Sequence, residues 1–152
     1  MYREAITLVH GEQLYTDLLD RIQDDGELVA AMWADAESRP GELDQPGTHW
    51  SVLLLEDGTP AAWCAARIED GTLKCHSNYE VRAWRGRRLY EDAYHARHRD
   101  VVRPYGLPAV TYLFDAPIGL HEAHGWRRTG QTGTGVTGHQ WWELRRPGRE
   151  QA

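Results

Sequence analysis

The sequence is poor in lysine, in cysteine and in long apolar runs. Lys74 is the one lysine among its 17 basic residues, and only Cys64 and Cys75 are cysteines among 152 residues. A stretch of about eighteen consecutive apolar residues, which a transmembrane helix needs, does not occur. The first residues also lack the charged, apolar and small-residue segments of a signal peptide. We therefore expect a cytoplasmic protein with no membrane partner.

The charge is modest overall and unevenly distributed. A net charge of −6 argues against general nucleic-acid binding. Residues 1–75 hold 15 acidic and 5 basic residues, whereas residues 76–152 hold 8 acidic and 12 basic residues. Either these are two ordinary solvated surfaces, or the C-terminal half binds a polyanion and the N-terminal half a cation.

The two cysteines are predicted to be reduced. The pair Asp70–Gly71 is typical of a two-residue hairpin turn, and that register places Ala66 opposite Cys75. Cys64 is then diagonal to Cys75, at roughly 7–8 Å. This separation is long for a disulfide, so we expect two mostly buried thiols.

Hydrophobic periodicity and turn residues predict an alternation of helices and strands. Strands are predicted at residues 5–9, 50–58, 60–71, 72–81, 108–114, 127–131 and 139–146. Helices are predicted at residues 11–23, 26–37, 87–102 and 118–126, the third of them ended by Arg103–Pro104. The order β-α-α-β-β-β-α-β-α-β-β predicts a single α/β (α+β) domain over residues 1–152, with a mixed sheet flanked by helices.

That order, with residues 80–100 ("EVRAWRGRRLYEDAYHARHRD") and the stretch "GLHEAHGW", resembles the GNAT superfamily of acyl-CoA N-acyltransferases. The resemblance covers essentially the whole chain. It implies a mostly antiparallel sheet and transfer of an acyl group, acetyl in the first instance, from acetyl-CoA or another acyl-CoA to a small amine. The acidic first half favours a cationic acceptor, and a homodimer is left open.

The turn before the third helix is where the resemblance implies a coenzyme A site. In the family its R/Q-x-x-G-x-G/A run holds the pyrophosphate on backbone amides; here the run is Arg85–Tyr90. Arg88 and Tyr90 replace the two signature glycines, so arginine side chains take over from the backbone, or the turn binds nothing. The implied cofactor residues are Val81, Arg85, Gly86, Arg87, Arg88 and Tyr90.

Strand 72–81 is predicted to carry the catalytic base. Simple alternation would put Lys74, His76, Asn78 and Glu80 on one face. His76 titrates near neutral pH, and Glu80 is the alternative, acting through a water; Asn78 is expected to contact the substrate. The other interpretation of this polar row is a hydrogen-bond network that orders the sheet.

The second family motif, L-Y-x-x-x-G-F, matches Leu120–Trp126 with His121 in place of the tyrosine. The resemblance implies that His121 protonates the leaving thiolate. Trp33 and Trp50 flank the Pro/Gly-rich loop 38–49, where the family shapes its acceptor pocket, so both are candidate substrate contacts.

Two further sequence patterns are weaker indications of a binding site. His95 with His98, and His121 with His124, have the i, i+3 spacing of zinc ligands, but no third ligand lies near them in sequence, so no metal is predicted. "GTGVTG", residues 133–138, matches G-x-G-x-x-G but precedes a strand, so we interpret it as a flexible hairpin loop.

Two alternatives to acyl transfer remain open at the level of sequence. The first is an enzyme that keeps the fold, has lost coenzyme A and catalyses another reaction in the same cleft. The second is a non-catalytic binding module, in which the polar row would be inert to mutation.

Overall fold

The computed structural model describes residues 4–114 and 117–149. Its strands are β1 (Ile6–Val9), β2 (His49–Leu54), β3 (Pro60–Glu69), β4 (Thr72–Glu80), β5 (Ala109–Leu113), β6 (Arg127–Thr134) and β7 (Gln140–Arg146). Its helices are α1 (Gln13–Gln23), α2 (Gly26–Ala36), α3 (Leu89–Arg97), α4 (Arg103–Tyr105) and α5 (Ile118–Glu122). Short 3₁₀ turns lie at Pro40–Leu43 and Arg82–Trp84, and a π-helical turn at His98–Val102.

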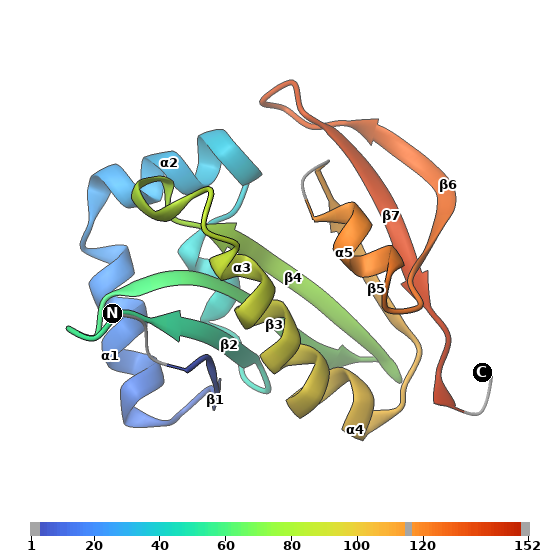
Figure 1. Cartoon of the computed structure of the whole chain (residues 1–152), viewed down its shortest axis with the longest axis horizontal. Helices are drawn as coiled ribbons and strands as arrows, with labels where there is room; N and C mark the ends of the chain where they lie inside the picture. Colours follow the sequence, from blue (N-terminus) through green and yellow to red (C-terminus); the bar gives the residue numbers. More distant parts are fainter. Residues whose placement is uncertain (1–3, 115–116, 150–152) are drawn as a thin grey trace.

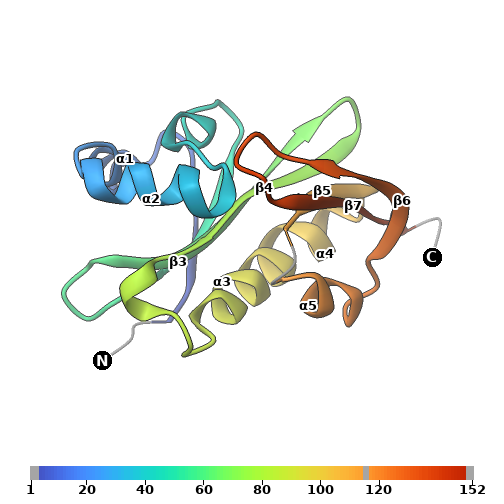
Figure 2. The same cartoon turned by 90° about the horizontal axis from the view of Figure 1, so that it is seen from above.

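The described strands form a seven-stranded sheet in the order β1-β2-β3-β4-β5-β7-β6. Each neighbouring pair is antiparallel except β4 and β5, which are parallel. Helices α1 and α2 cover one face of the sheet, and α3, α4 and α5 lie on the other (Figures 1 and 2). The predicted fold class and element order are confirmed.

The core on the α1–α2 face is built around aromatic side chains. Trp50 and Trp63 are fully buried on β2 and β3, with Tyr79 of β4 packed beside them. Helix α1 buries Tyr15 there, whereas Leu14, one residue earlier in the helical pattern, is 42% exposed. Tyr15 packs edge-on against Trp50, which explains why the aromatic residue occupies the core position.

The β3–β4 hairpin has the predicted register and free thiols. Ala66 pairs with Cys75, and the chain turns at Asp70–Gly71. Cys64 and Cys75 are both buried and neither forms a disulfide. Cys64 Sγ instead donates to the carbonyl oxygen of Ala93 at 3.4 Å.

Strand β4 contains a bulge that the sequence pattern did not reveal. Ala65 opposes His76 and Trp63 opposes Tyr79, so two β4 residues stand opposite the single residue between Trp63 and Ala65. Ser77, inside this bulge, has a φ of 55°. The extra residue reverses the alternation of side chains along the rest of the strand.

The expectation that the four polar residues of β4 share one face is therefore wrong. His76 lies opposite Ala65, which belongs to the core under α1 and α2, and Lys74 follows the same phase. Asn78 and Glu80 instead face α3, where both make hydrogen bonds to Tyr90. The bulge thus divides the row into two pairs on opposite faces.

Strands β4 and β5 pair over only three positions before they separate. Leu73, Lys74 and Cys75 pair with residues 109–111, and Thr111 Oγ1 donates to the carbonyl oxygen of Cys75 at 2.9 Å. Beyond that point the two strands diverge as a V, which opens between α2 and the β6–β7 hairpin (Figure 1). The parallel pairing thus leaves a wedge at the C-terminal ends of both strands.

The helix after β4 ends later than predicted. It begins at Leu89, passes through the π-helical turn and α4, and stops at Gly106, whose φ is 61°. The π turn at His98–Val102 widens the spiral just before Pro104, so the missing proline N–H and its ring are accommodated. The prediction that Arg103–Pro104 ends the helix was therefore wrong.

Candidate active site

A cavity of about 770 Å³ lies in the wedge between β4 and β5. Its walls are β4 from Cys75 to Glu80, the end of β5 with the residue that follows it (112–114), the last turn of α2 and the turn that precedes α3. The bulge of β4 lies at its centre, because His76, Ser77 and Asn78 all line it. The cavity is therefore built where the sheet's pairing stops.

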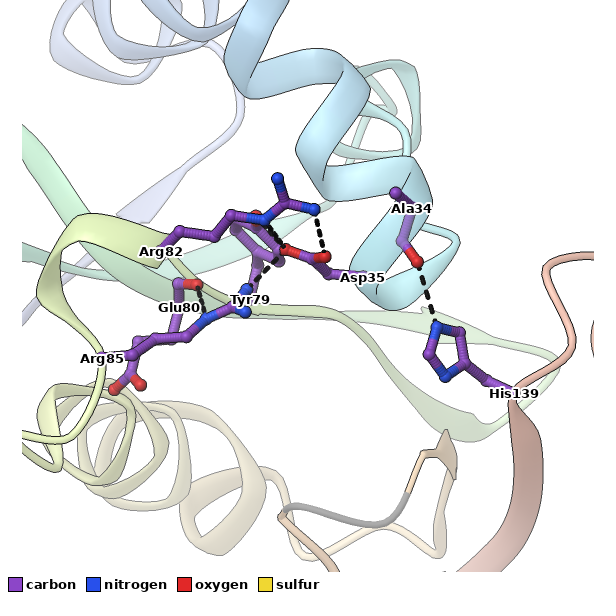
Figure 3. Close-up of polar contacts among 7 residues, drawn as sticks. All are labelled: Ala34, Asp35, Tyr79, Glu80, Arg82, Arg85 and His139. Carbon is purple, nitrogen blue, oxygen red and sulfur yellow. Dashed lines mark hydrogen bonds and ion pairs between the residues drawn. The ribbon is translucent and has the colours of Figure 1, made fainter.

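Backbone groups of β4 point into this wedge. Tyr79 pairs with Trp63, and Val81 N donates to the carbonyl oxygen of Ala61 at 2.9 Å. Because the hydrogen-bonding direction alternates along a strand, the amide and carbonyl groups of Glu80 point away from β3. The Glu80 carbonyl oxygen accepts a hydrogen bond from Arg85 Nε at 3.1 Å (Figure 3). Among the described residues the pairing of β4 with β5 ends at Cys75, so an extended ligand carrying amide groups can lie along this edge of β4.

Asp35, at the end of α2, holds the arginines of the turn (Figure 3). Arg82 donates to both carboxylate oxygens, from Nη2 to Oδ1 at 2.6 Å and from Nε to Oδ2 at 2.7 Å. Arg85 Nη2 also donates to Oδ2, at 2.7 Å. Tyr79 Oη donates to the same oxygen at 3.0 Å. The hydrogen bonds from Arg82, Arg85 and Tyr79 hold the pKa of Asp35 well below its usual range. Arg85, predicted to bind pyrophosphate, is thus paired within the protein.

The turn keeps the backbone shape of a glycine-rich loop without both glycines. Gly86 has a φ of 83°, and Arg88, which immediately precedes α3, has a φ of 58°. Arg88 therefore holds the left-handed conformation that glycine adopts without strain. Its side chain lines the cavity and forms no hydrogen bond with another described residue, whereas the Arg87 guanidinium lies 5.1 Å from the Trp84 ring centroid.

A carboxylate of the protein already occupies the first turn of α3. Glu80 Oε2 accepts a hydrogen bond from Tyr90 N at 3.0 Å. The Tyr90 hydroxyl donates to Asn78 Oδ1 at 2.7 Å, so its ring is directed at β4 and the cavity wall. A phosphate that used this amide would have to displace Glu80.

His121 belongs to a buried network behind the cavity. It is 0% exposed, its Nε2 lies 3.0 Å from Arg97 Nη2, and its Nδ1 lies 2.8 Å from the carbonyl oxygen of Pro117. Because arginine only donates, Nε2 accepts and Nδ1 carries the proton. Burial, with the Arg97 charge, lowers the pKa of His121 to about 3. A neutral ring with both nitrogens engaged does not fit the expected role of proton donor.

The two candidate bases approach from opposite sides of β4. His76 lines the cavity with Nδ1 2.7 Å from Ser77 Oγ, and its Nε2 is buried with no partner among the described residues. Burial lowers the pKa of His76 to about 4, helped by the Arg67 and Arg97 charges, so the ring is neutral near pH 7. Glu80 lies on the other face, beneath α3.

The two tryptophans expected in the acceptor pocket do not line the cavity. Trp50 is 0% exposed in the core, and Trp33 packs under the Arg39 guanidinium at 4.3 Å from the ring centroid. Trp50 was therefore a wrong candidate, because its strand position is covered by α1. The aromatic residues that do line the cavity are Tyr112, Phe114 and Trp141. None of these three was predicted from the sequence as a site residue. Their position near the ends of predicted strands was the feature that could have indicated them.

The Gly/Thr-rich loop is docked on α2, although the sequence predicted a flexible hairpin loop. The Glu37 carboxylate accepts hydrogen bonds from Val136 N at 3.2 Å, Thr137 N at 3.5 Å and Thr137 Oγ1 at 2.7 Å. His139 Nε2 lies 3.0 Å from the carbonyl oxygen of Ala34 (Figure 3). We call the contact of Glu37 with residues 136–137 the Glu37 latch. It closes the wedge on the side of α2.

The histidine pairs converge, but not on a metal site. The His124 ring centroid lies 5.2 Å from that of His95 and 5.6 Å from that of His98, between α3 and α5. Across residues 4–114 and 117–149, no three His, Cys, Asp or Glu side chains are arranged to hold a metal ion. None of the helices in these ranges is long and apolar enough to cross a bilayer.

Comparison with known proteins identifies the architecture. No protein-family model and no curated protein sequence matches the chain. An acyl-CoA N-acyltransferase structure from Pseudomonas aeruginosa matches with a TM-score of 0.67 and 16% identity, covering 94% of this chain and 98% of that one. The chain has the GNAT fold.

Two further structures agree. ElaA from Escherichia coli has a TM-score of 0.70 and 13% identity over 96% of this chain and 99% of its own. The ribosomal-protein-S18-alanine N-acetyltransferase from Escherichia coli has a TM-score of 0.67 and 12% identity over 97% of this chain and 94% of its own. Matches with such low sequence identity support a shared fold but not a shared reaction. The reaction has to be argued from the site.

Proposed function

We propose that the chain is an N-acyltransferase that moves an acyl group, acetyl in the simplest case, from acyl-CoA to a small amine. The observation that carries this proposal is the cavity in the wedge, where the edge of β4 has left its pairing with β5 and runs toward the basic turn before α3. The pantetheine arm of coenzyme A carries amide groups that such an edge can pair with. The residues present fit acyl-CoA as a co-substrate.

The phosphates would be held by side chains more than by the backbone. Arg88 lines the cavity without a hydrogen bond from the described residues, and Arg87 lies on the same turn. The N-terminus of α3 adds its positive dipole end, although Glu80 partly neutralises it. Val81, Arg85 and Gly86 would shape the turn.

The reaction needs a base for the incoming amine. His76 and Glu80 both reach the cavity, and we keep both as candidates. Acidic residues among its walls, notably Glu42 and Glu91, support a cationic acceptor. The amine would lie between α2 and the β6–β7 loop, beside Tyr112, Phe114 and Trp141.

The test is calorimetry with acetyl-CoA over a salt series, followed by turnover with small amines of different charge. Binding through exposed arginines should weaken steeply as ionic strength rises. Arg88→Ala should weaken it further, while Arg99→Ala, on the far end of the same helical segment, should not. An absence of heat at low salt and about millimolar ligand would reject the proposal.

A second candidate rests on the internal pairing of the anion-binding groups. Arg85 is held by Asp35, and the Tyr90 amide is held by Glu80. These contacts favour a GNAT-fold enzyme that has lost coenzyme A and uses the wedge for a different reaction. The same calorimetry separates the two functions, because only the first requires acyl-CoA to bind.

A further inference from the structure

The orientation of the Asn78 side-chain amide is fixed by its neighbours. Arg97 Nη1 lies 3.0 Å and Tyr90 Oη 2.7 Å from the same atom of Asn78. Arginine has no acceptor, so that atom must be the carbonyl oxygen Oδ1. The NH₂ group then lies at the other end of the amide, and it forms no hydrogen bond with a described residue. Because Asn78 lines the cavity, this donor is available to a ligand.

The support behind Asn78 is rigid. Arg97 is 0% exposed, and its guanidinium also donates to the carbonyl oxygen of Ala65 at 3.3 Å and contacts His121 Nε2 at 3.0 Å. Tyr90 approaches from the first turn of α3. An amide held by two donors at its oxygen cannot rotate without breaking both contacts, so its N–H groups are preorganised.

The buried guanidinium also sets the electrostatics of the cavity wall. Within residues 4–114 and 117–149, Arg97 forms no ion pair with a carboxylate. A positive charge that donates into Oδ1 draws electron density away from the amide, which strengthens its N–H groups as donors. The wall at Asn78 therefore favours negative charge on a bound substrate.

We propose that the Asn78 side-chain amide donates to the thioester oxygen and stabilises the negative charge that develops there, with Arg97 and Tyr90 as positioning residues. This inference rests on the proposed acyl transfer. As the amine nitrogen bonds to the carbonyl carbon, the C=O electron pair moves to oxygen, where Asn78 Nδ2–H donates without transferring its proton. The pair then re-forms C=O, the C–S bond breaks toward sulfur, and the amine proton passes to the base.

Asn78→Asp is the decisive variant. Its carboxylate keeps an oxygen for both Arg97 and Tyr90 and gives the buried guanidinium a counter-ion, but it replaces the NH₂ donor. We expect unchanged or higher thermal stability, and a kcat lower by roughly 10²–10³-fold. A purely structural Asn78 predicts the opposite result, namely wild-type kcat in this well-folded variant, and that result would overturn the proposal.

Asn78→Leu controls for the added charge. It removes the donor without introducing an anion, so kcat per folded molecule should fall by a similar factor. If Asn78→Leu kept its kcat while Asn78→Asp lost it, repulsion by the new carboxylate would be the cause and Asn78 would not be the donor. Tyr90→Phe, which removes one of the two hydrogen bonds at Oδ1, should reduce kcat by a smaller factor.

A readout independent of turnover uses the ¹H–¹⁵N signals of the Asn78 side-chain amide. They should shift when the wild-type protein binds a ketone analogue of acetyl-CoA, in which a methylene group replaces sulfur. Binding without any shift would overturn the role of Asn78 and leave the proposed function standing. No binding of either ligand by the wild-type protein would reject the proposed function, and this inference with it.

Discussion

The function of single side chains in this protein depends on what lies behind them. His121 lies where the L-Y-x-x-x-G-F motif, which the sequence resembles, has its tyrosine, yet its two nitrogens contact Arg97 and Pro117. Asn78 sits in the same network, but its free end reaches the cavity. Two residues joined through one guanidinium thus differ in what remains available: both nitrogens of His121 have partners within the protein, whereas the NH₂ group of Asn78 is left for the ligand of our proposal.

His121→Phe should therefore reduce stability more than activity. It leaves Arg97 Nη2 without its acceptor in a buried site, which costs about 1–3 kcal/mol. Urea unfolding should show that loss, while kcat per folded molecule changes little. His121→Gln, whose side-chain oxygen can accept from Arg97, should recover part of the stability. A kcat lowered by about 10² or more in a well-folded His121→Phe protein would reinstate His121 as the proton donor.

Arg88 has two separable roles, one in the backbone and one in charge. Its φ of 58° is strained for a residue with a side chain. Arg88→Gly should relieve that strain and raise the free energy of unfolding by up to about 1 kcal/mol, after the entropy cost of glycine. Arg88→Ala keeps the strain and removes the same charge. Both variants should bind acetyl-CoA more weakly at low salt, and equal stabilities for the two would show that the turn is unstrained.

At the scale of the elements, the α2 terminus connects both sides of the wedge. Asp35 ties it to the turn before α3, and Glu37 ties it to the β6–β7 loop (Figure 3 shows the first of these contacts). The loop sequence "GTGVTG" thus does bind a carboxylate on its backbone amides, but the carboxylate is the protein's own. The end of helix α2 therefore sets the width of the wedge between the turn before α3 and the β6–β7 loop.

Removing the Glu37 latch should free the β6–β7 loop. In Glu37→Ala, the amides of Val136 and Thr137 lose their acceptor, and hydrogen exchange at these positions should accelerate by roughly tenfold, the equivalent of one lost hydrogen bond. Glu12→Ala, at the start of α1, is a matched control that should leave the loop unchanged. Unaltered exchange in Glu37→Ala would mean that the loop is held by its own hairpin contacts.

The elements were predictable from the sequence to the extent that periodicity controls them. The order of strands and helices follows from alternating and helical apolar patterns, and the structure confirms it. The bulge at Ser77 could not be foreseen, because a serine with positive φ leaves no glycine signal. The continuation of the helix past Pro104 depends on a π turn that no local pattern announces.

The site was less predictable, for a related reason. One extra residue in β4 separated His76 from Glu80, and the cover provided by α1 removed Trp50 from the pocket. Both outcomes depend on contacts between segments distant in the sequence. The network of Arg97 was missed because an arginine within a charged helix looks like a solvated residue.

At the scale of the whole molecule, stability should fall on mild acidification. Three histidines have a pKa well below the ordinary value of 6.5, mainly because they are buried. The pKa is about 4 for His76 and His98 and about 3 for His121. Between those values and 6.5 the unfolded chain binds more protons than the folded one, so the free energy of unfolding decreases as pH falls. The stabilising contribution is complete above pH 6.5 and is lost progressively below it.

Urea titrations at several pH values between 7.5 and 4.5 would measure this slope. His121→Gln should flatten it by about 1.4 kcal/mol per pH unit, the value for one proton, in the part of the range where the unfolded histidine is protonated. His10→Gln is the matched control, because His10 makes its hydrogen bond to Asp44 at the surface. It should leave the slope unchanged. A stability that stays level down to pH 4.5 would contradict the buried, neutral state of these rings.

Because β4 and β5 pair over a short length, the chain could be divided into two fragments between them. A cut in the connection at residues 106–108 would leave one fragment with β1 to β4 and α1 to α4, and a second with β5, α5, β6 and β7. Their sheet contact is three residue pairs long, and it is supplemented by a buried apolar cluster with side chains from both fragments, by Arg97 with His121 and by the Glu37 latch. A ligand in the wedge would contact both fragments and stabilise their complex. Reassembly of a split protein would then report directly on what the cavity holds.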